Sequence, residues 1–107
     1  MDILEKSIQQ FDSKVKYVSS DWAYFSYNQN LSDSGWKIHI SSQMKDAVSI
    51  FTIVASFLRK IECSFKVAKD IESLKKINSP RETSPIANKF MAIYPANDKQ
   101  AREIILA

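Results

Sequence analysis

The sequence predicts an α+β fold, in which a mostly antiparallel sheet has helices packed on one face. Three β-prone segments precede the first long amphipathic helix, and the short link between the first two favours antiparallel pairing. The rest of the chain alternates between helical and extended patterns, so that some parallel pairing is also permitted. A length of 107 residues suits one domain and leaves no room for two.

The N-terminal third predicts two strands after a charged lead segment. Residues 1–12 are compatible with either a short helix or a mobile arm. Residues 14–19 alternate in character, and residues 22–27 are aromatic and β-prone. A turn at residues 19–21 would join them, which predicts a hairpin.

A period-two segment follows the polar loop at residues 28–35. In Trp36–Ser41, the residues Trp36, Ile38 and Ile40 face one side of a strand and are expected in the core. Lys37 and His39 face the other side, about 7 Å apart along the strand. One cation and the only histidine of the chain are therefore expected on the same surface.

The remaining elements are predicted from periodicity and from helix-capping residues. Apolar residues recur at three- and four-residue spacing after Ser42, which is expected to cap a helix that ends at Lys60. The other expected elements are a strand at 64–68, a helix from Asp70 to Ile77, a loop at 78–88, a strand at 89–94, and a helix capped by Asn97 or Asp98 that is still running at Ala107.

Composition excludes several classes of protein. A net charge of +3, from 15 basic and 12 acidic residues, allows an anionic ligand but does not by itself indicate nucleic acid, for which a denser basic stripe is expected. One cysteine, Cys63, cannot form an internal disulfide, no zinc-like spacing occurs, and Cys63 is expected in the core. No signal peptide is recognisable, and the longest apolar stretch, Ala47–Leu58, is too short for a bilayer. We expect a cytoplasmic protein without membrane contact or metal.

The arrangement of cations predicts an anion site. Lys37 and His39 share one strand face, Lys66 lies between two apolar residues of another strand, and Lys89 opens a third. Arg81, in the loop at 78–88, could lean over the same face. Such a cluster is unfavourable without an anion because like charges repel at close range. The alternative is that these are ordinary solvent-facing lysines, which are common on strands at sheet edges.

The sequence resembles a known family at four places in the expected order. The segment GWKIHIS at residues 35–41 resembles the N-terminal lyase region of class III and class IV lanthipeptide synthetases. Further similar segments are Phe65-Lys66, Asn78-Ser79 and Lys89-Phe90 with Ile93-Tyr94-Pro95, so that the resemblance covers about residues 34–106. The same lysine–x–histidine pattern is similar to that of bacterial effector phosphothreonine lyases.

The resemblance implies β-elimination of phosphate from phosphoserine or phosphothreonine, which gives dehydroalanine or dehydrobutyrine. No metal or organic cofactor is implied for this step. By matching position, Lys66 would be the general base that removes the α-proton, and His39 the general acid that protonates the leaving phosphate. Lys37 would stabilise the enolate-like charge, and Lys89 and Arg81 would bind the phosphate.

The resemblance also implies partners and has departures. The partners would be a phosphorylated precursor peptide, with leader and core parts, and the kinase and cyclase domains of the same synthetase. In the family an arginine directly follows Asn-Ser and a glycine precedes the Lys-Phe strand, whereas this chain has Pro80 before Arg81 and Asn88 before Lys89. Further phosphate-binding arginines of the family would lie downstream, so we expect a single lyase domain truncated at its C-terminal end.

Three other readings of the sequence remain open. One is a non-catalytic peptide-binding domain of the same synthetase, in which aromatic residues at 22–27 could hold a leader peptide, although a core position is expected for them. Another is an effector-type phosphothreonine lyase. The third is a small nucleic-acid binder, whose affinity would fall steeply with salt.

Overall fold

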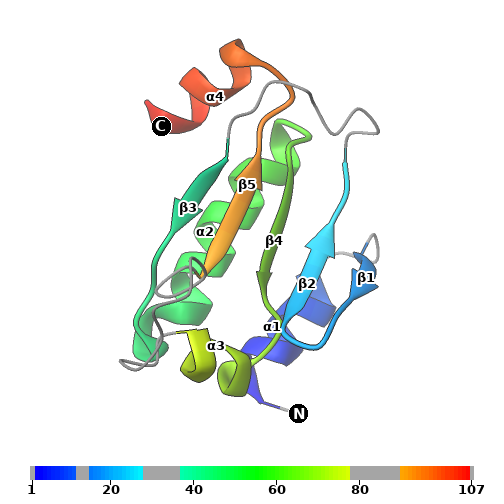
Figure 1. Cartoon of the computed structure of the whole chain (residues 1–107), viewed down its shortest axis with the longest axis vertical. Coiled ribbons are helices and arrows are strands. Elements are labelled where there is room, and N and C mark those ends of the chain that lie inside the picture. Colours follow the sequence, from blue (N-terminus) through cyan, green and yellow to red (C-terminus); the bar gives the residue numbers. More distant parts are fainter. Residues whose placement is uncertain (1, 12–14, 28–36, 78–89, 107) are drawn as a thin grey trace.

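The structure, a computed structural model, describes residues 2–11, 15–27, 37–77 and 90–106. Within these ranges the chain forms a five-stranded sheet with helices on one face (Figure 1), which confirms the predicted α+β class. Helices α1 (Ile3–Phe11) and α2 (Ala47–Lys60) lie behind the sheet, and α4 (Asp98–Ile105) lies beyond the end of strand β5 (Met91–Tyr94). None of the described helices is both long and apolar enough to cross a membrane.

The sheet is antiparallel at every pairing of the described strands. Its order in space is β1-β2-β4-β5-β3, so the third strand along the chain lies at the edge, next to the last strand. The other four strands are β1 (Val15–Val18), β2 (Trp22–Phe25), β3 (Ile38–Ile40) and β4 (Ser64–Ala68). The predicted hairpin is formed by β1 and β2, and the parallel pairing that the later crossovers permitted does not occur among these strands.

The N-terminal segment is a helix rather than an arm. Leu4 and Ile8, one helical turn apart on α1, are buried in the core. Phe11, at the end of the same helix, contacts the rings of Phe25 and Phe51 edge-on, with centroids 5.7 and 5.4 Å away. Of the two predicted alternatives, the described part of this segment has the short helix, at Ile3–Phe11.

The predicted start of the long helix is wrong. Instead of Ser42 capping it, a 3-10 turn at Met44–Asp46 comes first and α2 begins at Ala47. The Ser42 hydroxyl is buried and donates a hydrogen bond to the carbonyl oxygen of Gln43 at 2.8 Å, and the N-cap position of α2 is taken by Asp46. Apolar periodicity locates a helix face but does not distinguish an α-helical first turn from a 3-10 turn.

The other two predicted caps are confirmed. An Asp70 carboxylate oxygen accepts from the backbone N–H of Ser73 at 2.8 Å, directly before α3 (Ile71–Ile77). Asn97 accepts from the backbone N–H of Gln100, also at 2.8 Å, at the start of α4. The last helix ends at Ile105, so the prediction that it still runs at Ala107 is wrong.

The core lies between the sheet and helices α1 and α2. Phe25 of β2 and Phe65 of β4 stack with ring centroids 4.8 Å apart, and Phe51 of α2 packs against Phe25. Helix α2 buries one stripe of residues, namely Ala47, Phe51, Ala55 and Leu58. Met91 and Ile93 of β5 are buried as well. Because side chains alternate along a strand, the residues next to these core residues on β2, β4 and β5 project from the opposite face of the sheet, which we call the open face.

Candidate functional site

The strand register brings two predicted catalytic residues onto the open face. Lys66 of β4 lies opposite Ala92 of β5, and Ala92 lies opposite His39 of β3 on its other side. Residues directly opposite each other in an antiparallel sheet project to the same face, so Lys66 and His39 do so too. Their strands are not direct neighbours, since β5 lies between them, and two strand spacings put their Cα atoms about 10 Å apart.

Lys37 lies on the same face, one period-two step from His39. It directly precedes β3, and its ammonium nitrogen is 6.0 Å from the ring centroid of Tyr94. Tyr94 is two residues after Ala92 on β5 and therefore shares the open face. Lys66, His39 and Lys37, predicted from two separate segments, are thus on one surface.

The two predicted phosphate-binding residues are outside the described residues. Lys89 and Arg81 both fall in the range 78–89. Their expected role stays a prediction.

Lys66 is half-buried against two aromatic rings. Its ammonium nitrogen is 4.4 Å from the ring centroid of Trp22 and 5.9 Å from that of Tyr24, both on β2. An aromatic face stabilises a cation, so this contact favours the charged amine. In contrast, the side chains of His39 and Lys37 are exposed. Ala92, on the strand that lies between Lys66 and His39, is only 1% exposed.

A pocket of about 320 Å³ opens beside Lys66. Its lining residues belong to three adjacent strands and the residue that follows β2: Tyr24, Phe25, Ser26, Ser64, Phe65 and Tyr94. Burial, and secondarily the nearby Tyr24, raise the pKa of Tyr94 above its ordinary value. The Tyr94 phenol therefore keeps its donatable proton to higher pH than an ordinary tyrosine does.

Sequence reasoning did not join the aromatic residues to the predicted cation cluster. The aromatic segment was expected mainly in the core; Phe25 is buried there, and Trp22 is also buried, with its ring against Lys66 on the open face. Tyr24, however, is half-buried and lines the pocket, as does Tyr94. Period-two alternation would have put Tyr24 on the face opposite Phe25, but only the long-range pairing of β2 with β4 shows that it meets Lys66.

Cys63 belongs to the core, as predicted. Its side chain is fully buried, and burial raises the pKa of the thiol to about 12. Since the thiolate is the nucleophilic form, a thiol held neutral in this way is unreactive at physiological pH.

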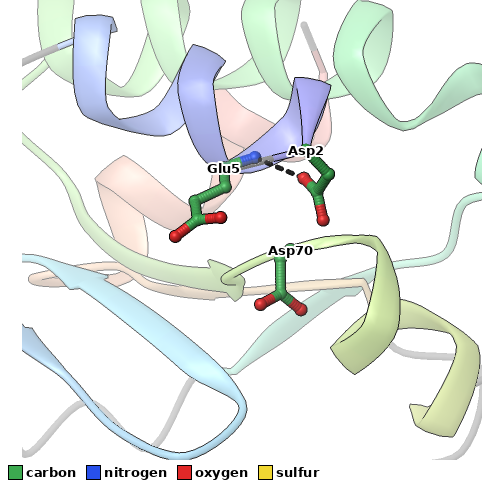
Figure 2. A group of neighbouring side chains, drawn as sticks. All are labelled: Asp2, Glu5 and Asp70. Atoms are coloured by element: carbon green, nitrogen blue, oxygen red, sulfur yellow. Dashed lines mark hydrogen bonds between the residues drawn. The ribbon is translucent and has the colours of Figure 1, made fainter.

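A second cluster of ionisable groups lies away from these cations. The carboxylates of Asp2, Glu5 and Asp70 gather between the start of α1 and the start of α3 (Figure 2), with ligand atoms within 4.8 Å of one another. Asp2 accepts from the backbone N–H groups of Glu5 and Ile71, each at 2.8 Å. Asp70 caps α3, so helix capping accounts for both aspartates without a ligand.

The chain matches the model of a known protein family. The family model described as the RamC N-terminal domain matches residues 8–107, and RamC is a lanthipeptide synthetase-related protein. The match includes every strand of the sheet and all the predicted site residues. No curated protein matches the chain.

Proposed function

Because the chain belongs to the RamC N-terminal domain family, we propose that it is a phosphoserine/phosphothreonine lyase domain of lanthipeptide biosynthesis. In this proposal it eliminates phosphate from a phosphorylated precursor peptide in the cytoplasm, leaving dehydroalanine or dehydrobutyrine. The kinase and cyclase domains of the same synthetase would act before and after it. No cofactor takes part in the proposed step.

One observation carries the proposal: Lys66 and His39 emerge from the same face of the sheet on either side of Ala92. β-Elimination needs a base at Cα and an acid at the oxygen on Cβ of one substrate residue. Two side chains that rise from one face, with one strand between them, can approach one phosphorylated residue from both sides. Groups on opposite faces could not.

The chemistry assigns one role to each of three residues. Lys66, as the neutral amine, takes the α-proton, and the electrons of the Cα–H bond form the Cα=Cβ double bond. The Cβ–O bond breaks, and phosphate leaves with a proton from His39. The Lys37 ammonium stabilises the enolate-like charge on the neighbouring carbonyl. A bound phosphate dianion would also keep the imidazole of His39 protonated to higher pH.

The contact of Lys66 with Trp22 gives this proposal a further requirement. The ring stabilises the ammonium, whereas a base must be the neutral amine. We infer that the bound peptide moves the Lys66 amine away from the ring before the proton transfer. Lys89 and Arg81, as predicted from the resemblance, would complete the phosphate site.

The same contact favours a second candidate, a peptide-binding domain without catalysis. A lysine held as a cation between Trp22 and Tyr24 suits recognition of an anionic group as well as it suits a resting base. The two candidates differ only in whether bound phosphopeptide is converted. An effector-type lyase would share the chemistry but accept a phosphorylated protein unrelated to lanthipeptides.

The deciding experiment is incubation of the chain with a phosphoserine peptide, followed by mass spectrometry. A lyase gives a product that has lost phosphoric acid, and Lys66→Ala and His39→Ala should each slow that loss by about 100-fold or more. Lys60→Ala, at the exposed end of α2, is the matched control and should retain it. An unchanged peptide that nevertheless binds the wild-type chain would favour the binding domain.

A further inference from the structure

The pocket beside Lys66 has a cation near each of two aromatic walls. The Lys66 ammonium is 5.9 Å from the ring of Tyr24, and the Lys37 ammonium is 6.0 Å from the ring of Tyr94. Both rings line the pocket, together with Ser26, Ser64 and the strand segments at Phe25 and Phe65, whose own side chains are buried on the other face. An apolar recess thus has positive charge at two of its walls.

The size and lining of the recess limit what can occupy it. Its volume of about 320 Å³ is at the small end of the range of roughly 300–1,000 Å³ seen for ligand pockets. One of its two serine hydroxyls, that of Ser64, already accepts a hydrogen bond from the backbone N–H of Tyr27 at 3.1 Å. One apolar side chain fits such a space, and the flanking cations favour a ligand that also carries negative charge nearby.

The position of the recess relative to Lys66 sets the spacing of such a ligand. Ser64 is two residues before Lys66 on β4, which is about 7 Å along the strand. In an extended peptide, side chains two residues apart also project to the same side about 7 Å apart. If the phosphorylated residue of an extended peptide lies over Lys66 and His39, the residue two positions away in that peptide therefore reaches the recess.

We propose that this recess is a specificity pocket for an apolar side chain two residues from the phosphorylated residue of the substrate peptide. The inference rests on the proposed function, because it takes the phosphorylated residue to lie over Lys66 and His39. It adds a substrate class: phosphopeptides with a leucine-like or aromatic side chain at the second position before or after the phosphoserine.

The experiment measures binding, so that it does not depend on turnover. Fluorescently labelled phosphoserine peptides carry leucine or serine two residues before, or two residues after, the phosphoserine. Their dissociation constants are determined for the wild-type chain, for Ser26→Phe, which fills the recess, and for the control Ser56→Phe on the exposed surface of α2. We expect leucine at one of the two positions to bind about tenfold more tightly to the wild type and to Ser56→Phe. In Ser26→Phe the preference should fall below about twofold.

Three results would overturn the specificity pocket: equal affinity for the leucine and serine peptides at both positions, a preference that survives in Ser26→Phe, or no binding of any peptide. Mass spectrometry of the same mixtures separates this inference from the proposed function. Phosphate loss without a leucine preference would support the proposed lyase function and contradict the specificity pocket. A leucine preference without phosphate loss would support the specificity pocket and contradict the proposed lyase function.

Discussion

The two faces of the sheet are built from the same strands but from different chemistry. On the helix-covered face, Phe25 and Phe65 stack in a core from which water is excluded. On the open face, the residues next to them in sequence, Tyr24 and Lys66, form a cation–π contact beside a pocket. The difference shows how one alternating pattern can serve two purposes: the covered face supplies the core, and in the proposed function the open face supplies the ligand chemistry.

This division predicts that substitutions on the two faces act on different measurements. A change in the core should lower the free energy of unfolding, whereas a change on the open face should act mainly on peptide conversion or binding. The following predictions start with the largest expected effect.

The largest effect on stability is expected from Phe65→Ala. The ring is 1% exposed and stacked on Phe25, so its removal leaves a cavity and should lower the free energy of unfolding by about 3–5 kcal/mol. Urea denaturation followed by circular dichroism measures this. Ile53→Ala, at a side chain that is 71% exposed on α2, is the control and should change stability by less than about 0.5 kcal/mol. Equal effects of both variants would contradict the assignment of the core.

On the open face, Lys66→Arg separates chemistry from charge. Arginine keeps a cation beside Trp22 but cannot serve as a base, so elimination should fall by about 100- to 10,000-fold, as in Lys66→Ala. Phosphopeptide affinity should change little in Lys66→Arg, and the free energy of unfolding by less than about 1 kcal/mol. Elimination at the wild-type rate in Lys66→Arg would rule out Lys66 as the base.

A smaller effect is expected from Asp2, which joins two helices on the covered side. Asp2→Ala removes acceptors for the backbone N–H groups of Glu5 and Ile71 and should destabilise the fold by about 1–2 kcal/mol. Asp2→Asn, which retains one acceptor oxygen, should cost less. A divalent-metal chelator should leave the thermal midpoint of the wild type unchanged. A lower midpoint with the chelator would show that the carboxylate cluster binds a cation.

The effect that is smallest at neutral pH is a loss of stability that develops only at alkaline pH, to which Cys63 of the core and Tyr94 of the open face both contribute. The pKa of Cys63 is raised from 9.0 to about 12, and that of Tyr94 is also raised, so both groups ionise more readily in the unfolded chain. Their contribution is complete below their unfolded pKa values and is lost as pH rises through the folded ones. Between pH 9 and 11, Cys63→Ala and Tyr94→Phe should each lose less stability than the wild type. Parallel pH profiles would contradict the burial of these groups.

Local signals in the sequence were sufficient for much of the covered face. Strand β4 has the predicted bounds, Ser64–Ala68, because two apolar core residues alternate with a cation between them. The caps at Asp70 and Asn97 depend only on residues within one turn, so sequence reasoning could find them. The start of α2 was missed because the 3-10 turn before it has a similar apolar spacing.

The open face was predicted only in part, because its assembly depends on long-range pairing. The alternation around Lys37, His39 and Lys66 showed that each projects from a strand face. It did not show that β5 lies between the strand of Lys66 and the strand of His39. The neighbours Tyr24 and Tyr94 meet the cations through registers between segments about 40 to 60 residues apart. No local pattern records such a register.

The central claim is that Lys66 and His39 act together on one phosphorylated residue, and a double-mutant cycle on elimination tests it most directly. Phosphate release from a phosphoserine peptide is measured for the wild type, Lys66→Ala, His39→Ala and the double variant. If both residues serve one elimination step, the double variant should be within about threefold of the slower single variant. Rate losses that multiply, or a single variant as fast as the wild type, would contradict the claim.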